Sequence, residues 1–115
     1  MFTRRLTLGV AIAALTLGFA GAASAQCDTR FTLRNASGQQ VNEFYFGSSA
    51  NPNWGNDQLG QGVLPNGASM NFQSRFAGNH DFKVVWANGQ TAELMQVNVC
   101  TTSEIVATPR GIEAR

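Results

Sequence analysis

The chain has 115 residues, a formal net charge of +1, 43% hydrophobic residues and 13% charged residues. This length suits one domain, and the balanced charge excludes the basic surface that nucleic-acid binding requires. One histidine and two cysteines make a multi-ligand transition-metal site unexpected, and we predict no metal and no cofactor.

Residues 1–25 have the three parts of a secretory signal peptide. Arg4-Arg5 supplies the basic start, residues 6–20 form an apolar run, and positions 23–25 read Ala-Ser-Ala, a small-x-small cleavage site. The apolar run falls short of the roughly 20 residues that span a membrane. We therefore predict cleavage after Ala25 and a mature chain without a membrane span.

Two variants of export stay open. Cys27 could be lipidated, although Gln26 stands where a small residue normally precedes such a cysteine, and Arg4-Arg5 matches a twin-arginine signal only in part. Export of the unfolded chain is favoured over both. Removal of the signal leaves six basic against seven acidic residues, so the mature chain is near −1. The predicted location is periplasmic or secreted.

The two cysteines predict a structural disulfide, because an even pair in a small exported domain is more typical of a crosslink than of catalysis. No C-x-x-C spacing suggests redox chemistry. The bond would join Cys27, at the start of the first predicted strand, to Cys100, at the end of the fifth. If those strands are antiparallel neighbours, the two sulfur atoms meet at one end of a sheet.

The mature chain alternates apolar and polar side chains with period two, which is typical of half-buried strands. The Asn88-Gly89 pair predicts a hairpin, because both residues tolerate positive φ. The period breaks near Met95-Gln96, which predicts a β-bulge. The sixth strand is expected at an edge, followed by a flexible tail at residues 110–115. The expected strands are residues 29–34, 41–46, 68–76, 81–87, 91–99 and 104–108.

These elements predict an all-β fold, since no segment shows sustained helical periodicity. We expect residues 26–109 to form a single antiparallel β-sandwich of about six to seven strands, immunoglobulin-like in type. Six aromatic side chains should supply most of its core: Phe31, Phe44, Phe46, Phe72, Phe82 and Trp86.

Residues 47–67 form one long connection, and ordered loops above about 12–15 residues tend to be functional or disordered. Four apolar residues, Trp54, Leu59, Val63 and Leu64, predict that the loop packs onto the domain. We expect its recognition surface to centre on Trp54 and Asp57. The candidate ligand-binding residues are Tyr45, Asn53, Trp54, Asn56 and Asp57.

The loop also carries a motif, Trp54-Gly55-x-Asp57-x-Leu59-Gly60, followed by Leu64-x-x-Gly67. It resembles the signature of an uncharacterised family of small exported bacterial proteins. The resemblance implies a compact β-sandwich and no catalytic residue or cofactor. It extends to three further stretches, which read Leu33-x-Asn35-x-Ser37-Gly38, Asp81-Phe82-Lys83-Val84 and Val97-x-Val99-Cys100.

One departure from that family concerns the disulfide. Its members often carry a cysteine just before the Asp-x-Lys/Arg-Val strand, where this chain has Asn79-His80. Cys27 is then the alternative partner of Cys100.

Three interpretations of Asp57 stay open. Its carboxylate could accept backbone N–H bonds inside the loop. It could bind a hard cation with oxygens of Asn53 or Asn56, although one acid is too few for tight calcium binding. The surface could instead bind carbohydrate through an exposed Trp54 or Tyr45, because aromatic faces stack on sugars.

Catalytic patterns are weak. In Asn79-His80-Asp81, neighbouring side chains of a strand point to opposite faces, and we expect His80 to be exposed at a strand start. The acids are scattered singly, and no G-x-S-x-G, phosphate loop or H-E-x-x-H occurs. We predict a non-catalytic binding or structural protein whose partner is an unknown protein or an envelope glycan. The alternative is a small hydrolase or enzyme inhibitor that uses the 47–67 loop.

Overall fold

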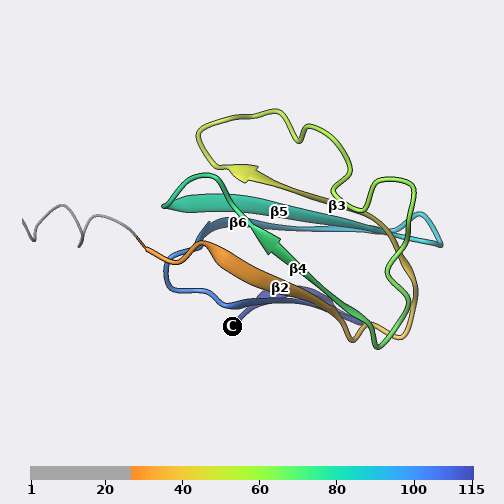
Figure 1. Ribbon diagram of the computed structural model, residues 1–115. Coiled ribbons are helices and arrows are strands. Elements are labelled where there is room, and N and C mark those ends of the chain that lie inside the picture. Colours follow the sequence, from red (N-terminus) through yellow and green to blue (C-terminus); the bar gives the residue numbers. More distant parts are fainter. Residues whose placement is uncertain (1–26) are drawn as a thin grey trace, which may run out of the picture.

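The computed structural model describes residues 27–115, and the predicted signal peptide (1–25) lies outside the described residues. Seven strands of the described residues form two packed sheets, so the all-β sandwich is confirmed (Figure 1). The described part includes no helix of the length and hydropathy needed to cross a membrane. The strands are β2 (Arg30–Asn35), β3 (Val41–Ser48), β4 (Ser69–Gln73), β5 (Asn79–Trp86), β6 (Thr91–Asn98), β7 (Glu104–Thr108) and β8 (Gly111–Ala114).

The strand order is β4-β2-β7-β8 in one sheet and β3-β5-β6 in the other. All pairs are antiparallel except β2 and β7, which run parallel with Leu33 opposite Ile105. The expectation of a purely antiparallel sandwich is therefore wrong at this pair. Because β2 and β7 lie far apart in the sequence, no hairpin fixes their relative direction.

The predicted flexible tail, residues 110–115, is instead ordered as β8. It pairs with β7, with Val106 opposite Glu113 and Ala107 opposite Ile112. Ile112 is buried against the core and alternates with the exposed Glu113, so even this short segment has one apolar face. β7 consequently lies inside its sheet and is not the edge strand that we expected.

Aromatic side chains fill the space between the sheets, as predicted. The Phe31 ring lies 5.0 Å from Phe46, 5.4 Å from Phe82 and 5.7 Å from Phe72, measured between centroids. Phe31, Phe44, Phe82 and Trp86 are buried, while Phe46 and Phe72 are partly buried and pack on the same cluster. Edge-on and stacked ring pairs of this kind add about 0.5–1.5 kcal/mol each beyond burial.

The predicted strand at 68–76 is shorter than expected, and its apolar face is only partly buried. β4 ends at Gln73, so Phe76 lies beyond the strand with 62% of its surface exposed. Met70 is also exposed, which leaves Phe72 as the residue of β4 that packs on the core cluster.

The hairpin and the bulge between β5 and β6 are both confirmed. Two residues, Met95 and Gln96, oppose the single Asp81, and Gln96 takes a φ of 58°. In the hairpin loop, Gly89 has a φ of 86°, whereas Asn88 does not take positive φ. A three-residue loop with glycine in last place fits this geometry.

The disulfide between Cys27 and Cys100 is confirmed, with the two Cα atoms 5.4 Å apart. Its position differs from the expected one, because Cys27 precedes β2 and Cys100 follows β6, which belong to different sheets. The bond therefore links the two layers of the sandwich. Such a bond is typical of an oxidising compartment outside the cytoplasm.

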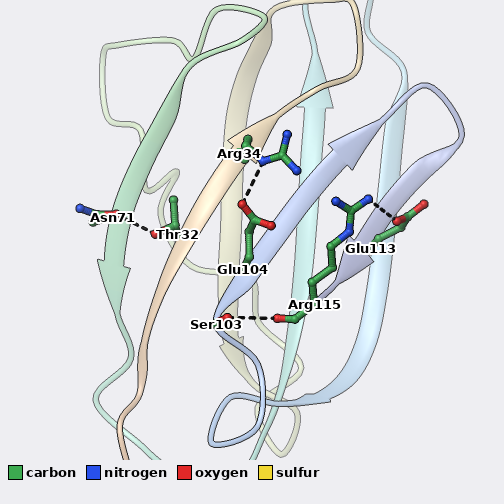
Figure 2. Close-up of polar contacts among 7 residues, drawn as sticks. All are labelled: Thr32, Arg34, Asn71, Ser103, Glu104, Glu113 and Arg115. Carbon is green, nitrogen blue, oxygen red and sulfur yellow. Dashed lines mark hydrogen bonds and ion pairs between the residues drawn. The ribbon is translucent and has the colours of Figure 1, made fainter.

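Polar side chains on the outer face of the four-stranded sheet pair with one another (Figure 2). The Arg34 guanidinium donates to Glu104 at 2.9 Å, from β2 to β7. The Thr32 hydroxyl donates to the Asn71 amide oxygen at 2.8 Å, from β2 to β4. These two bonds link β2 to both of its neighbours across the outer face of the sheet.

Candidate functional site

The long loop covers the open edge of β3. At the Phe44 peptide, Gln58 donates its N–H to the carbonyl at 2.7 Å, and the N–H donates to Asp57 at 2.9 Å. Further along, Val41 and Leu64 exchange two backbone hydrogen bonds of 2.9 and 2.8 Å. A covered edge cannot pair with another chain, so one role of this loop is structural.

The Trp-Gly-x-Asp-x-Leu-Gly motif holds the loop in this position. One oxygen of Asp57 accepts the N–H groups of both Phe44 and Leu59 at 2.9 Å. Leu59 is buried, and Gly60 takes a φ of 64° that suits glycine. Among the three interpretations of Asp57, this geometry matches the acceptance of backbone N–H bonds.

The other predicted anchors of the loop differ in burial. Leu64 is buried, Trp54 is partly buried, and Val63 is exposed, so Val63 does not anchor the loop. Leu64 is held by the buried Asn35, whose amide donates to the Leu64 carbonyl at 2.9 Å. The backbone carbonyl of Asn35 also accepts the Gly67 N–H at 2.7 Å. The Leu33-x-Asn35 stretch and the Leu64-x-x-Gly67 stretch are therefore hydrogen-bonded to each other.

Trp54 lies over the outer face of the three-stranded sheet. Tyr45 on β3 is directly opposite Lys83 on β5. The Lys83 ammonium lies 5.7 Å from the centre of the Tyr45 ring and 5.8 Å from that of Trp54. The two rings are 6.5 Å apart. A cation shared by two aromatic faces holds the indole in place.

A groove of about 380 Å³ lies beside Trp54, between the loop and the sheet. We call it the outer groove. Its side chains combine one aromatic ring with two carboxylates and three amides, as well as the thioether of Met95. The residues of the outer groove that matter below are Asn51, Asn53 and Trp54 from the loop, and Asp81, Glu93, Met95 and Gln96 from β5 and β6.

The β-bulge shapes the wall of the outer groove. One oxygen of Asp81 accepts the Gln96 N–H at 2.9 Å and the Ser49 hydroxyl at 2.6 Å. The Asp81 carboxylate thus connects the loop, through Ser49, to the bulge, through Gln96. The extra residue of the bulge lets the Gln96 N–H point at this carboxylate. Bulges commonly redirect side chains next to binding sites.

The predicted candidates lie in three different settings. Asn53 and Trp54 line the outer groove, and Tyr45 contacts Trp54 from the sheet. Asp57 anchors the loop, and Asn56 is exposed outside the residues that line the groove. Sequence reasoning missed Asp81 and Glu93 as groove residues, although the broken period at Met95-Gln96 pointed to this part of the sheet.

The expectation that His80 is exposed is wrong. Only 1% of its surface is accessible, because His80 shares the inward face of β5 with Phe82, Val84 and Trp86. Its Nε2 atom lies 2.5 Å from the Ser74 hydroxyl. The continued alternation of β5 back to position 80 was the signal for this burial.

Tyr45 has a perturbed acidity. Its hydroxyl donates to Glu43 at 2.5 Å, and this bond, with burial and the negative charges of Glu43 and Asp57, raises the pKa of Tyr45 to about 12. The phenol is therefore neutral over the physiological range and acts as a hydrogen-bond donor.

Removal of the Glu43 charge should restore an ordinary tyrosine. The chain has one tyrosine, so phenolate absorbance in a pH titration reports on Tyr45 alone. We expect a midpoint near 12 in the wild type and a shift toward the ordinary 10.0 in Glu43→Gln. The pKa of Tyr45 is higher in the folded protein than in the unfolded chain. The Tyr45–Glu43 bond therefore stabilises the fold fully below pH 10.0, and this contribution is lost as the pH rises toward 12. A wild-type midpoint near 10.0, equal to that of Glu43→Gln, would show that the bond does not form.

The chain matches no protein-family model, no curated protein and no solved structure. Within residues 27–115, no three histidine, cysteine or acidic side chains gather as a metal site would require. The fold and the site thus define a small disulfide-linked β-sandwich with an aromatic and polar groove on one outer face.

Proposed function

We propose that this is a small periplasmic or secreted binding protein, and that its outer groove binds a glycan of the cell envelope without chemical change. The observation that supports this proposal is the partly exposed Trp54 ring beside planar carboxylate and amide groups. The disulfide supports a non-cytoplasmic location.

The chemistry of the groove suits a sugar. An aromatic ring offers an apolar surface to the C–H face of a sugar ring. Carboxylates accept hydrogen bonds from sugar hydroxyls, and amides such as those of Asn53 and Gln96 both donate and accept them. The volume of about 380 Å³ lies in the range of small-ligand sites.

The site is also held in shape before any ligand binds. Lys83 and Tyr45 fix the Trp54 ring from the sheet side. The bonds from Ser49 and Gln96 fix the Asp81 carboxylate. Such preorganisation reduces the entropy that a ligand must otherwise offset.

Trp54→Ala should weaken glycan binding, because it removes the aromatic surface. The purified protein is titrated in a calorimeter with soluble chito-oligosaccharides and with peptidoglycan fragments. We expect at least one of them to bind, and Trp54→Ala to raise its Kd by about tenfold or more, which corresponds to roughly 1.4 kcal/mol.

Val63→Ala is the matched control, since Val63 is an exposed apolar residue of the same loop outside the groove. It should bind like the wild type. The proposal fails if none of these glycans binds the folded protein, or if Trp54→Ala binds them as well as Val63→Ala does.

A further inference from the structure

A second hollow, of about 660 Å³, lies beside the end of β3 and the connection from β4 to β5. We call it the serine pocket. Its lining includes two apolar rings, Phe46 and Phe76, and one cation, Arg75. It also includes Ser74 and His80, the one buried pair of a hydroxyl and an imidazole in the described part of the chain.

Ser74 and His80 are arranged as a nucleophile and its base. The Ser74 hydroxyl oxygen lies 2.5 Å from Nε2 of His80, and Nδ1 of His80 lies 3.1 Å from the carbonyl oxygen of Gly78. A carbonyl can only accept a hydrogen bond, so Nδ1 carries the hydrogen. In the neutral imidazole Nε2 is then the acceptor, and the Ser74 hydroxyl donates to it. A hydroxyl bonded to a base that a third group orients is the pattern of an activated nucleophile.

The pair is rigidly positioned between the two sheets. Ser74 follows β4, where its N–H donates to the Thr29 carbonyl at 3.1 Å and its carbonyl accepts the Thr29 hydroxyl at 2.7 Å. His80 belongs to β5, where it is opposite Val97 of β6. Ser74 is 6% exposed and His80 is 1% exposed, yet both border the hollow.

We propose that the serine pocket is an esterase-type site, in which Ser74 is the nucleophile and His80 the general base, for esters with an apolar acyl group. The Ser74 oxygen attacks the acyl carbon, and its proton passes to Nε2 of His80. The ester bond breaks, and the alcohol leaves with that proton. A water then attacks the acyl-serine, gives its proton to His80, and releases the acid as the proton returns to Ser74.

The lining matches this substrate class. Phe46 and Phe76 offer apolar surface to the acyl chain. Arg75 brings positive charge to the same lining, and positive charge favours the negative charge that develops on the carbonyl oxygen during acyl transfer. In a full catalytic triad a carboxylate orients the base, whereas here the backbone carbonyl of Gly78 orients His80. We therefore expect slow turnover, and covalent labelling is the more sensitive test.

The test is reaction of the purified protein with an alkyl fluorophosphonate. The serine oxygen attacks phosphorus, fluoride leaves, and the hydroxyl proton departs through His80. Intact-mass analysis and peptide mapping should find one adduct, located on Ser74. Ser74→Ala should not be labelled, whereas Ser69→Ala, which changes an exposed serine at the start of β4, should be labelled like the wild type.

His80→Gln tests the base. We expect its labelling rate to fall by about a hundredfold or more, because glutamine cannot take the proton. If circular dichroism shows that His80→Gln is unfolded, the comparison of the wild type with Ser74→Ala decides alone. The absence of an adduct on the folded wild type, or an adduct on another residue, would overturn the proposal. Neither outcome bears on glycan binding, which is measured separately.

Discussion

Replacement of both cysteines by serine is expected to lower the free energy of unfolding by about 4 kcal/mol. Cys27 and Cys100 are 73 positions apart, so the bond closes most of the described chain into one loop. A crosslink over such a span removes much of the entropy of the unfolded state. It also joins β2 to β6, and therefore one sheet to the other.

The measurement is equilibrium unfolding in denaturant, with the wild type in its oxidised and reduced forms as the comparison. Domains of this size have a net stability of roughly 5–13 kcal/mol, so the loss is a large fraction of the total. The reduced wild type should match the double variant. A loss below about 1 kcal/mol would contradict the view that the link between the layers carries much of the stability.

Asp57→Ala is expected to destabilise the fold by about 2–4 kcal/mol. The change leaves the N–H groups of Phe44 and Leu59 without their shared acceptor and releases the loop from the edge of β3. Both residues have buried side chains, so water replaces these bonds poorly. Asp57→Asn keeps an oxygen acceptor without the charge, and we expect about half the loss.

Asn56→Ala is the control for Asp57, because Asn56 is the exposed neighbour in the same loop. Its stability should stay within about 0.5 kcal/mol of the wild type. Thermal and denaturant unfolding of the three variants provide the comparison. If Asp57→Ala is as stable as Asn56→Ala but loses glycan binding, Asp57 is a ligand residue and not an anchor.

Local patterns predicted most of the fold. Period-two alternation located six strands, and one break in it at Met95-Gln96 located the bulge. The parallel pairing of β2 with β7 could not be predicted, because it joins segments that no short turn connects. β8 was missed because Ile112 is the single large apolar residue in a short charged tail, and its burial depends on a partner strand.

Around the outer groove, the residues that were predicted are those of the loop and Tyr45 on β3. Asn53 and Trp54 were found in the loop, whereas Asp81 and Glu93 come from strands that the loop approaches only in the folded protein. His80 was mispredicted because its polar neighbours, Asn79 and Asp81, suggested a strand end. The alternation with Phe82 extends back through His80, and Ser74 supplies the bond that makes its burial possible.

The most direct test of glycan recognition is a residue-resolved titration. Backbone and indole N–H signals of the labelled protein are followed by nuclear magnetic resonance as a chito-oligosaccharide or a peptidoglycan fragment is added. We expect the largest shifts at Trp54, Asn53 and Gln96, around the outer groove. Shifts confined to the opposite sheet, near Arg34 and Glu104, or no shifts at saturating ligand, would contradict this expectation.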